Sequence, residues 1–396
     1  MSLNETPSGE RLHIGFFGRR NAGKSTVVNA VTGQDLSVVS AVKGTTTDPV
    51  KKAMELLPLG PVMIIDTPGM DDEGELGSLR VKKTLQMLEI VDVAVLVVDA
   101  ALGLNDVDRL FLENVKKRNI ACLVAFNKCD VSGAQEPPDG GINSISVSGL
   151  LGTNIGLLKE KIGRSVDTES EKLRLVGDLI SPSDVVVLVT PIDKAAPKGR
   201  LILPQQQVIR DILESGAIAV VTREHELRDT LSKLGTAPRM VITDSQVFAK
   251  AAADVPPDTP LTSFSILFAR YKGLLGAALI GARTLDALRD GDRVLICEGC
   301  THHRQCDDIG TVKLPRWIRN YTGRELDFDF VSGGDFPSEL SAYKLVVHCG
   351  GCMLRDRTVR YRMSLAEAAG VPITNYGTAI AFMQGILERA VKVFEL

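Results

Sequence analysis

Short apolar, β-branched runs alternate with amphipathic segments over the first part of the chain. The apolar runs lie at residues 12–17, 62–65, 93–98 and 120–126. Between them, segments such as "VKKTLQMLEI" and "NDVDRLFLENVKKRN" repeat apolar residues at helical spacing. This alternation predicts βαβ units and a mainly parallel sheet, because parallel strands need a crossover helix between them.

The middle of the chain repeats this pattern on a smaller scale. "DVVVLVTPID", "AIAVVT" and "RMVIT" predict strands, while "QQQVIRDILESG" and "HELRDTLSKLG" predict helices that end at glycine. A polar stretch at 167–174 precedes this region, and the proline-rich "DVPPDTP" at 254–260 follows it. Because such segments interrupt regular structure, both are predicted domain boundaries.

The last third of the chain places strands next to cysteines. "DRVLICEGC" and "KLVVHCGGC" each predict a buried strand that runs directly into two cysteines. "LDFDFVSG" predicts a third strand, and "SLAEAAG" and "AIAFMQGILERAVKVF" predict helices. This region is therefore expected to be a further α/β layer with cysteines at two strand ends.

Composition narrows the class of protein. The 396 residues are 44% hydrophobic and 24% charged, with a formal net charge of −3. These values are ordinary for a globular chain and give no overall attraction to nucleic acid or to an anionic membrane. No apolar run reaches the ~18–20 residues that cross a bilayer, and the N-terminus lacks a signal-peptide pattern. Seven cysteines, most of them clustered, favour a reducing cytoplasm over a disulfide framework.

A phosphate-binding motif lies near the start of the chain. "GRRNAGKS" matches G-x-x-x-x-G-K-[ST] between a predicted strand and a predicted helix, which is the context that the motif needs. Gly18 and Gly23 let backbone N–H groups approach phosphate closely. Lys24 is expected to contact the β- and γ-phosphates, and the Ser25 hydroxyl to bind Mg²⁺.

Three further motifs favour a guanine nucleotide. "IIDTPG" places Asp66 where it can hold Mg²⁺ and the Gly69 N–H where it can sense the γ-phosphate. "FNKCD" offers the Asp130 carboxylate to a pair of guanine N–H donors that adenine lacks. "ISVSG" falls where a base-contacting loop belongs, with Val147 in place of the usual alanine. In order and spacing, these motifs resemble the GTPase family.

The subclass follows from the residues around these motifs. "KGTTTDPV" resembles the switch I segment of TrmE/Era-like GTPases, with Thr46 as the Mg²⁺-binding threonine. Met70 stands where Ras-like enzymes carry a water-orienting glutamine, so that catalytic element is missing. In the TrmE-like group an asparagine of the phosphate loop helps to bind K⁺. Asn21 occupies that place, although Arg20 stands where many relatives have proline; the alternative is that Asn21 only stabilises the loop. The resemblance implies slow, K⁺-stimulated GTP hydrolysis.

These motifs define the predicted nucleotide-site residues. The catalytic set is Lys24, Thr46, Asp66 and Gly69. The nucleotide-binding set is Asn21, Ala22, Gly23, Lys24, Ser25, Thr26, Asn127, Lys128, Asp130, Ser146 and Val147. Mg²⁺ is assigned to Ser25, Thr46 and Asp66, and K⁺ to Asn21.

The cysteine segments "ICEGCTHHRQC" and "HCGGC" leave three chemistries open. Two Cys-x-x-Cys pairs can make a Cys₄ zinc site, but the segment between them is far longer than the ~15–20 residues typical of such sites. Inert thiols are the second alternative. The third is an iron–sulfur cluster, because ligands gather beyond the carboxyl ends of parallel strands and adjacent glycines let N–H groups face cluster sulfides. The cysteine spacings of ferredoxins and of radical SAM enzymes are both absent.

One arrangement of cysteine and histidine matches a known family. Cys300-x-His302 is followed at a distance by His348-Cys349-x-x-Cys352, downstream of a TrmE/Era-like GTPase region. The combination resembles the maturase F family of [FeFe]-hydrogenase maturation GTPases, and the resemblance covers essentially the whole chain. It implies a [4Fe–4S] cluster on the three cysteines. His302 or His348 is a candidate fourth ligand, beside water or a carboxylate.

Four cysteines lie outside that family pattern, and one of them, Cys129, is the variable residue of N-K-x-D. Cys297 is close enough to Cys300 to compete as a ligand, although packing at the strand end is the favoured role. Cys306 is expected to be a local packing residue. Cys122, within "ACLVAF", is expected in the core.

The resemblance also implies a fold and a function. We expect an α/β chain of three α/β domains: a P-loop GTPase domain (1–168), a small dimerisation domain (175–260) and a C-terminal [4Fe–4S] cluster-binding domain (261–396). Such a protein is a homodimeric scaffold that hydrolyses GTP and carries a transient diiron precursor to apo [FeFe]-hydrogenase. Two radical SAM maturases are its further partners. Nucleotide state is predicted to control docking through segments 43–50 and 69–76.

A different class of function is the alternative. An RNA-modification or ribosome-assembly GTPase with a zinc-binding C-terminal domain would share the nucleotide motifs. The near-neutral charge and the lack of a basic cluster weigh against nucleic acid as a partner.

Overall fold

The computed structural model covers two compact units, Met1–Ser170 and Glu171–Leu396. The described residues are 9, 11–34, 50–70, 84, 86–131, 142–165, 173–192, 201–299, 308–333, 336–337 and 339–394. Several predicted features lie outside them: Thr46 with segments 43–49 and 71–76, most of the stretch 167–174, part of the predicted helix at 81–90, and Cys300, His302 and Cys306.

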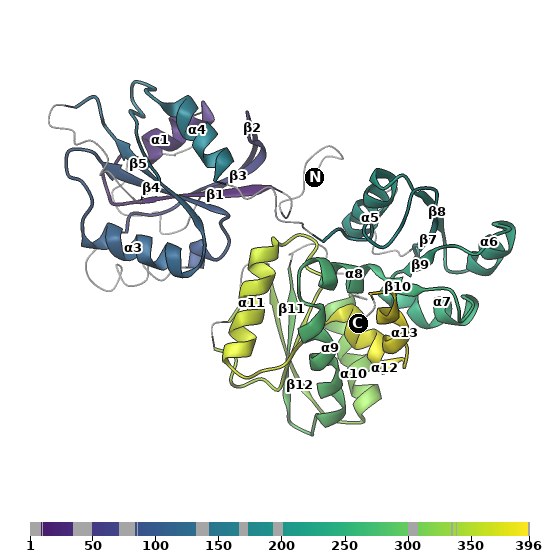
Figure 1. Cartoon of the computed structure of the whole chain (residues 1–396). Coiled ribbons are helices and arrows are strands. Elements are labelled where there is room, and N and C mark those ends of the chain that lie inside the picture. The colour runs from purple at the N-terminus through teal and green to yellow at the C-terminus, as the bar shows by residue number, and fades with distance from the viewer. Residues whose placement is uncertain are drawn as a thin grey trace. The chain divides into compact units, whose positions relative to one another are not determined.

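The first unit is built on a six-stranded sheet in the order β2-β3-β1-β4-β5-β6 (Figure 1). Its strands are β1 (Leu12–Gly18), β2 (Val50–Leu56), β3 (Gly60–Asp66), β4 (Val93–Asp99), β5 (Ala121–Asn127) and β6 (Ser144–Ser146). The four predicted apolar runs form β1, β3, β4 and β5, and only the pairing of β2 with β3 is antiparallel. The predicted mainly parallel sheet is therefore confirmed. Strand β2 was not predicted because most of its side chains are exposed and no apolar run marks it.

Helices cover both faces of this sheet. They are α1 (Lys24–Thr32), α3 (Asp106–Lys117) and α4 (Ile155–Arg164). Val27 and Val31 of α1 and Leu158 of α4 pack in one buried cluster with one face of the sheet. Phe111 and Val115 of α3 pack in a second cluster on the other face. The parallel strands therefore end together at one edge, where the loops that carry the nucleotide motifs begin.

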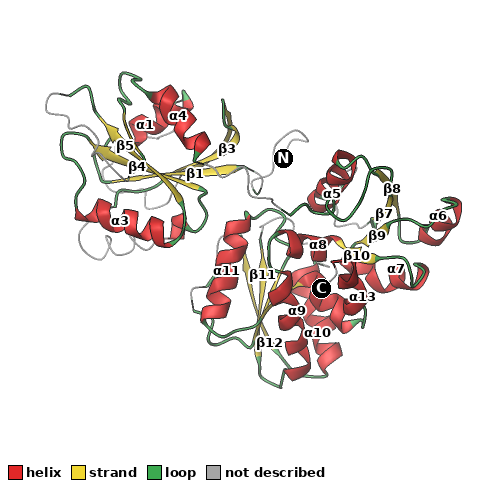
Figure 2. Ribbon diagram, viewed as in Figure 1, coloured by secondary structure: helices red, strands yellow, loops and turns green. Residues whose placement is uncertain are grey.

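The second unit contains two parallel four-stranded sheets (Figure 2). The first has the order β10-β9-β7-β8 and the second β12-β11-β13-β14. The first sheet comprises β7 (Val185–Val189), β8 (Ile218–Thr222), β9 (Met240–Thr243) and β10 (Leu261–Ser263), with α5 (Leu203–Glu214), α6 (Leu227–Lys233), α7 (Phe248–Asp254) and α8 (Phe264–Tyr271). The second comprises β11 (Arg293–Glu298), β12 (Asp327–Ser332), β13 (Leu345–His348) and β14 (Ile373–Asn375), with α9 (Leu275–Arg283), α10 (Leu314–Thr322), α11 (Asp356–Ala368), α12 (Tyr376–Met383) and α13 (Leu387–Val391).

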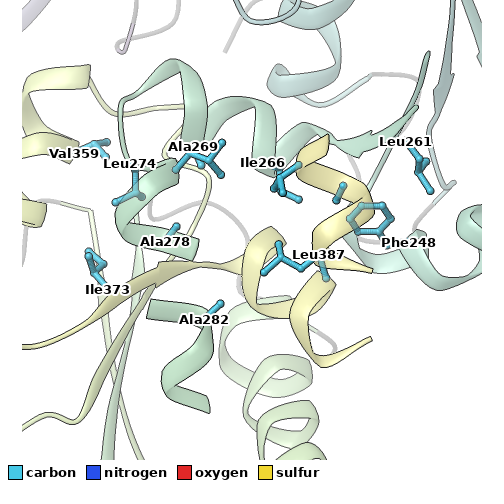
Figure 3. Packing of buried hydrophobic residues seen from close by; sticks show 14 of the residues in the cluster. Phe248, Leu261, Ile266, Ala269, Leu274, Ala278, Ala282, Val359, Ile373 and Leu387 are labelled. Carbon is cyan, nitrogen blue, oxygen red and sulfur yellow. The ribbon is translucent and has the colours of Figure 1, made fainter. Parts of the chain in front are cut away.

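One hydrophobic cluster joins these two sheets. It includes Val187 and Val241 from the first sheet and Leu295 and Val346 from the second. Side chains from several helices complete the cluster, and Figure 3 shows those of Phe248, Ile266, Ala278 and Leu387. The two sheets therefore share a core within the compact unit Glu171–Leu396, and the predicted division of this unit into two domains stays a prediction.

The proline-rich segment at 254–260 lies between elements as predicted, since α7 ends at Asp254 and β10 begins at Leu261. However, β10 pairs with β9, so the first sheet extends past the predicted boundary at 260. None of the helices in the described part of the chain has both the length and the apolar composition that crossing a bilayer requires.

Candidate functional site

The phosphate loop connects β1 to α1 through a tight turn. Asn21 and Gly23 have φ angles of +61° and +81°, in the left-handed region. A Cβ atom at Gly23 would lie 2.2 Å from the Asn127 side-chain nitrogen. Glycine is therefore required at position 23 by both backbone conformation and space.

Lys24, Ser25 and Asp66, three of the residues predicted to hold phosphate and Mg²⁺, lie together. Lys24 Nζ is 3.3 Å from Asp66 Oδ1, and the Ser25 hydroxyl donates to Asp66 Oδ2 over 3.4 Å. These contacts arise because β1 and β3 are paired neighbours, with Phe16 opposite Asp66. Hydroxyl and carboxylate oxygens are the ligands that Mg²⁺ prefers, so this donor set fits the ion.

Asn127 ties the phosphate loop to the predicted base-contacting loop. It ends β5 and is only 3% exposed. Its side-chain nitrogen donates to the Ala22 carbonyl over 3.0 Å, and its side-chain oxygen accepts from the Gly149 N–H over 2.9 Å. Gly149 was missing from the predicted set although it closes the quoted "ISVSG" motif. Asn127 therefore supports the nucleotide site by linking these two loops.

Lys128 makes a second connection to the phosphate loop. Its ammonium donates to the Asn21 carbonyl over 2.8 Å and to Asp99 Oδ2 over 2.6 Å. Burial acts to raise the pKa of Asp99, but the hydrogen bonds from Lys128 and the Ala101 N–H outweigh it, so that the pKa is lowered. Asp99 was not predicted, although it ends β4 directly opposite Asn127. The rule that ligands gather at the carboxyl ends of parallel strands points to it.

The base-contacting loop tolerates valine at position 147 because the side chain points inward. Val147 is fully buried. Its N–H donates to the Phe126 carbonyl over 2.8 Å, and its carbonyl accepts from the Cys129 N–H over 3.2 Å. Asp130 is exposed at the following turn, as a carboxylate that meets a base must be.

Arg19 anchors the phosphate loop to α3. Its Nε lies 3.1 Å from Asp108 Oδ2, and its guanidinium also donates to the Gly103 carbonyl over 2.7 Å. The Asp108 side chain is fully buried and also closes the N-terminal cap of α3 with Asn105. No sequence signal distinguished this pair, because Asp108 lies outside the nucleotide motifs, in the helix α3.

The Met70 side chain lies in the core of the first unit. It is 5% exposed and packs with Phe17 and Leu96, while its N–H donates to the Gly18 carbonyl over 3.3 Å. Position 70 therefore presents its backbone to the phosphate loop and its side chain to the core.

The two cysteine motifs meet at the ends of adjacent strands. Strand β11 pairs with β13 so that Cys297 lies opposite His348. The Cys349 N–H donates to the Cys297 carbonyl over 2.8 Å. Cys297 packs in the cluster shared by the two sheets, whereas Cys349 packs on the other face of its sheet. Alternation along the strands therefore directs these two thiols to opposite faces.

Two backbone N–H groups point at the Cys349 sulfur. Gly299 donates to Cys349 Sγ over 3.0 Å, and Gly351 donates over 3.4 Å. Such donors stabilise negative charge on sulfur, which is what a thiolate ligand requires. Cys352 is partly buried against the cluster under the first sheet of the second unit. The donor set at 349–352 therefore fits an iron–sulfur ligand pair, with the predicted third ligand, Cys300, outside the described residues.

Cys297 lies in the hydrophobic core. It has no exposed surface, and burial raises the pKa of its thiol above the ordinary value. A protonated thiol is a poor metal ligand. Of its two predicted roles, the structure supports packing at the strand end.

Both ring nitrogens of His348 have a hydrogen-bond partner. Nδ1 lies 2.7 Å from the Cys349 carbonyl, and Nε2 lies 3.0 Å from Nη1 of Arg362. Burial, together with the Arg362 charge, lowers the pKa of His348 to about 4. Binding of iron by His348 would require the ring to leave Arg362, and this role stays a prediction. Within the described ranges, which exclude Cys300 and His302, no three His, Cys, Asp or Glu side chains are grouped to hold a metal ion.

Comparison with protein families gives one match for each of three regions of the chain. Residues 13–128 match the family described as "50S ribosome-binding GTPase". Residues 175–273 match the "Hydrogen maturase F dimerization domain", and residues 276–393 match the "Hydrogen maturase F tetramerization domain".

Individual relatives resemble the GTPase region. The chain is 31% identical over 185 residues to GTPase Der of Wolinella succinogenes, covering 43% of this chain and 39% of that protein. It is 30% identical over 156 residues to the tRNA modification GTPase MnmE of Dechloromonas aromatica, covering 39% of this chain and 34% of that protein. The chain thus spans well under half of the length of these curated relatives. A structure of Era from Aquifex aeolicus with GDP and AlF₄⁻ has 21% identity and a TM-score of 0.35, covering 53% of this chain and 92% of that chain.

Fold, site and family matches together define an α/β protein with an N-terminal P-loop GTPase domain, which uses GTP and Mg²⁺, and two assembly domains. The GTPase domain is of the TrmE/Era-like kind. The chain belongs to the hydrogen maturase F family, which is a family of hydrogenase maturation GTPases.

Proposed function

We propose that the protein is a GTP-hydrolysing scaffold that binds a [4Fe–4S] cluster and assembles or delivers the diiron subcluster to apo [FeFe]-hydrogenase. The observation that carries this proposal is the meeting of the two cysteine motifs at neighbouring strand ends, with two N–H groups directed at Cys349 Sγ. The maturase F matches over residues 175–273 and 276–393 favour this function over the RNA-modification alternative.

The cluster ligands in this proposal are Cys300, Cys349 and Cys352. A bound cluster would supply iron that exchanges its fourth ligand, which suits a carrier that must release its cargo. The protein's own contribution is to place Cys349 just past a strand end and to direct two backbone N–H groups toward its sulfur. His302 or His348 as the fourth ligand belongs to the same proposal.

The proposed hydrolysis is slow and K⁺-stimulated. Ser25, Thr46 and Asp66 would hold Mg²⁺, and Asn21 would contribute to a K⁺ site. The buried Met70 side chain offers no group to orient water, so the cation must supply the charge that stabilises the transition state.

The proposed partners are a second copy of the chain, apo [FeFe]-hydrogenase and two radical SAM maturases, in the cytoplasm. Dimerisation and tetramerisation domains support self-association. Nucleotide state would regulate docking through the segments at 43–50 and 69–76. Equal affinity of a partner for the GTP-bound, GDP-bound and nucleotide-free protein would contradict this regulation.

Anaerobic reconstitution with iron and sulfide tests the central proposal. The wild-type protein should bind about four irons per chain and show a charge-transfer band near ~400 nm, as a cysteine-ligated cluster requires. The combined variant Cys300→Ser, Cys349→Ser and Cys352→Ser should bind none, while Cys122→Ser, in the GTPase domain, should bind as the wild type does. A triple variant that still assembled the cluster would disprove the ligand assignment. Activation of apo-hydrogenase by the loaded protein tests delivery.

A further inference from the structure

Lys272 is a buried lysine at the end of α8, the helix that follows the last strand of the first sheet in the second unit. Its side chain is 5% exposed. The ammonium donates to the Leu354 carbonyl over 2.6 Å, and Nζ lies 3.0 Å from Oδ1 of Asp356. Nζ also lies 5.6 Å from the centre of the Tyr271 ring. A buried ammonium is costly unless charge and hydrogen bonds compensate it, so these partners fix its position.

The Leu354 carbonyl belongs to the loop that follows β13 and carries the second cysteine motif. Leu354 lies two residues after the last cysteine of that motif, and its N–H donates to the Gly351 carbonyl over 2.9 Å, which closes a turn. Its side chain lies over Gly299, since a Cβ atom at Gly299 would be 2.8 Å from Leu354 Cγ. The Gly299 N–H in turn donates to Cys349 Sγ over 3.0 Å. Lys272 therefore holds the residue that closes the turn and covers the donor to a cysteine sulfur.

Helix α8 meets the same loop at two further points. Ser265, in its first turn, lies close to Gly350, where a Cβ atom would be 3.6 Å from Ser265 Oγ. Cys352 packs against the hydrophobic cluster that contains Phe268. Positions 265, 268 and 272 are separated by three and four residues, so they share one face of the helix. This face of α8 therefore follows the loop, and Lys272 holds its last turn.

We propose that Lys272 is a positioning residue for the cluster ligands Cys349 and Cys352, and that it acts by holding the Leu354 carbonyl. The inference rests on the proposed function, because these cysteines are ligands assigned there. Several thiolates bind one cluster only if the turn between two of them keeps its shape. Residues outside the ligand set provide such support in metal sites, and their loss weakens metal binding.

The contact between Lys272 and Leu354 joins two regions of the second unit. Lys272 belongs to residues 175–273, which match the dimerization family, and Leu354 to residues 276–393, which match the tetramerization family. The cysteines at 349 and 352 lie in the second of these regions, whereas the lysine and its helix come from the first. In this proposal the dimerization region therefore completes the ligand site of its neighbour.

The test compares iron release from the full-length, anaerobically reconstituted protein and its variants. Lys272→Met keeps an unbranched side chain but removes the charge and the hydrogen-bond donors. We expect it to lose iron to a chelator about 10- to 100-fold faster than the wild type. Arg270→Met is the matched control, because Arg270 lies on the same helix and makes the same kinds of contact with the Arg174 carbonyl and with Asp178. It should release iron at the wild-type rate.

Stability measurements separate positioning from a general structural role. Each variant loses an ion pair, so each should lower the free energy of unfolding, measured with denaturant on the apo protein. A merely structural lysine predicts that iron release follows this loss of stability in both variants. Faster release in Lys272→Met alone, at a comparable loss of stability, supports the proposal. Equal release rates in the two variants would overturn it.

A second variant leaves the buried lysine in place. Leu354→Ala keeps the carbonyl that Lys272 holds but removes the side chain that covers Gly299. We expect faster iron release and a changed EPR spectrum of the reduced cluster, because the Gly299 N–H is no longer held toward Cys349 Sγ. A wild-type release rate with an unchanged spectrum would overturn the link from the lysine to the ligands. Failure of the wild-type protein to bind iron would instead refute the proposed function itself.

Discussion

The nucleotide site and the cysteine site are supported in different ways. In the nucleotide site most contacts run between one short motif and another, as Lys24 contacts Asp66 and Asn127 contacts Ala22. In the cysteine site the motifs meet, but the charge and hydrogen bonds behind them come from Arg362 on a separate helix. A site made from motifs can be read from sequence because each motif carries its own spacing. A supporting residue outside every motif carries no such mark.

The largest expected effect separates the two sites. Lys24→Ala removes the charge that faces the β- and γ-phosphates, so GTP hydrolysis should fall at least about 100-fold. The iron content of the reconstituted variant should remain that of the wild type, because the ion pair of the lysine is with Asp66 of the same unit. Phosphate release and an iron assay on the same preparation provide both measurements.

Lys233→Ala is the control for this variant, because Lys233 is exposed on α6. It should leave both quantities unchanged. Hydrolysis by Lys24→Ala at the wild-type rate would refute the catalytic assignment. A parallel loss of iron would show that the two sites are not independent, and would break the comparison.

A smaller effect sharpens the description of the nucleotide site. Replacement of K⁺ by Na⁺ at constant ionic strength should lower turnover at least about tenfold, because the smaller ion cannot replace the missing transition-state charge in the same position. Asn21→Ala should reduce turnover in K⁺ to the Na⁺ level. Asn143→Ala, at an exposed position of the same unit, should retain the K⁺ response. If wild-type turnover is equal in the two salts, no K⁺ site exists and Asn21 only shapes the loop.

Arg19 and Asp108 show that the nucleotide site also has a support outside its motifs. Asp108→Asn leaves the largely buried Arg19 guanidinium without its carboxylate, and should lower the free energy of unfolding of the first unit by about 3 kcal/mol. It should also raise the KM for GTP, because Arg19 belongs to the phosphate loop. Glu160→Gln is the control, since its pair with Arg164 is exposed and should contribute less than about 1 kcal/mol. Denaturant unfolding measures the loss of stability in both variants. Equally small losses would mean that the pair of Arg19 with Asp108 does not support the site.

Sequence patterns predicted most of the fold and the polar motifs, for physical reasons. Apolar runs at 12–17 and 93–98 predicted strands because buried parallel strands are apolar on both faces. The core that the two sheets of the second unit share was not predicted, because "DVPPDTP" shows where regular structure stops and not whether cores merge. Contacts such as Arg19 with Asp108 and Arg362 with His348 depend on tertiary neighbours, which spacing alone does not specify.

The smallest expected effect compares Cys122, which is partly buried against a core cluster of the first unit, with the buried Cys297 of the second unit. Burial raises the pKa of Cys122 from 9.0 to about 12, and it also raises that of Cys297. A raised pKa in the folded state means that the protonated thiol stabilises the fold fully below the unfolded pKa, and that this contribution is lost as pH rises through the folded value. Stability should therefore decline from about pH 9 upward in the apo protein. Cys122→Ala should reduce that decline in the first unit, and Cys297→Ala in the second, as measured by unfolding at pH 8 and pH 10.5. Cys129→Ala is the control because that thiol is not in the apolar cluster. An unchanged alkaline decline in both core variants would show that other groups cause it.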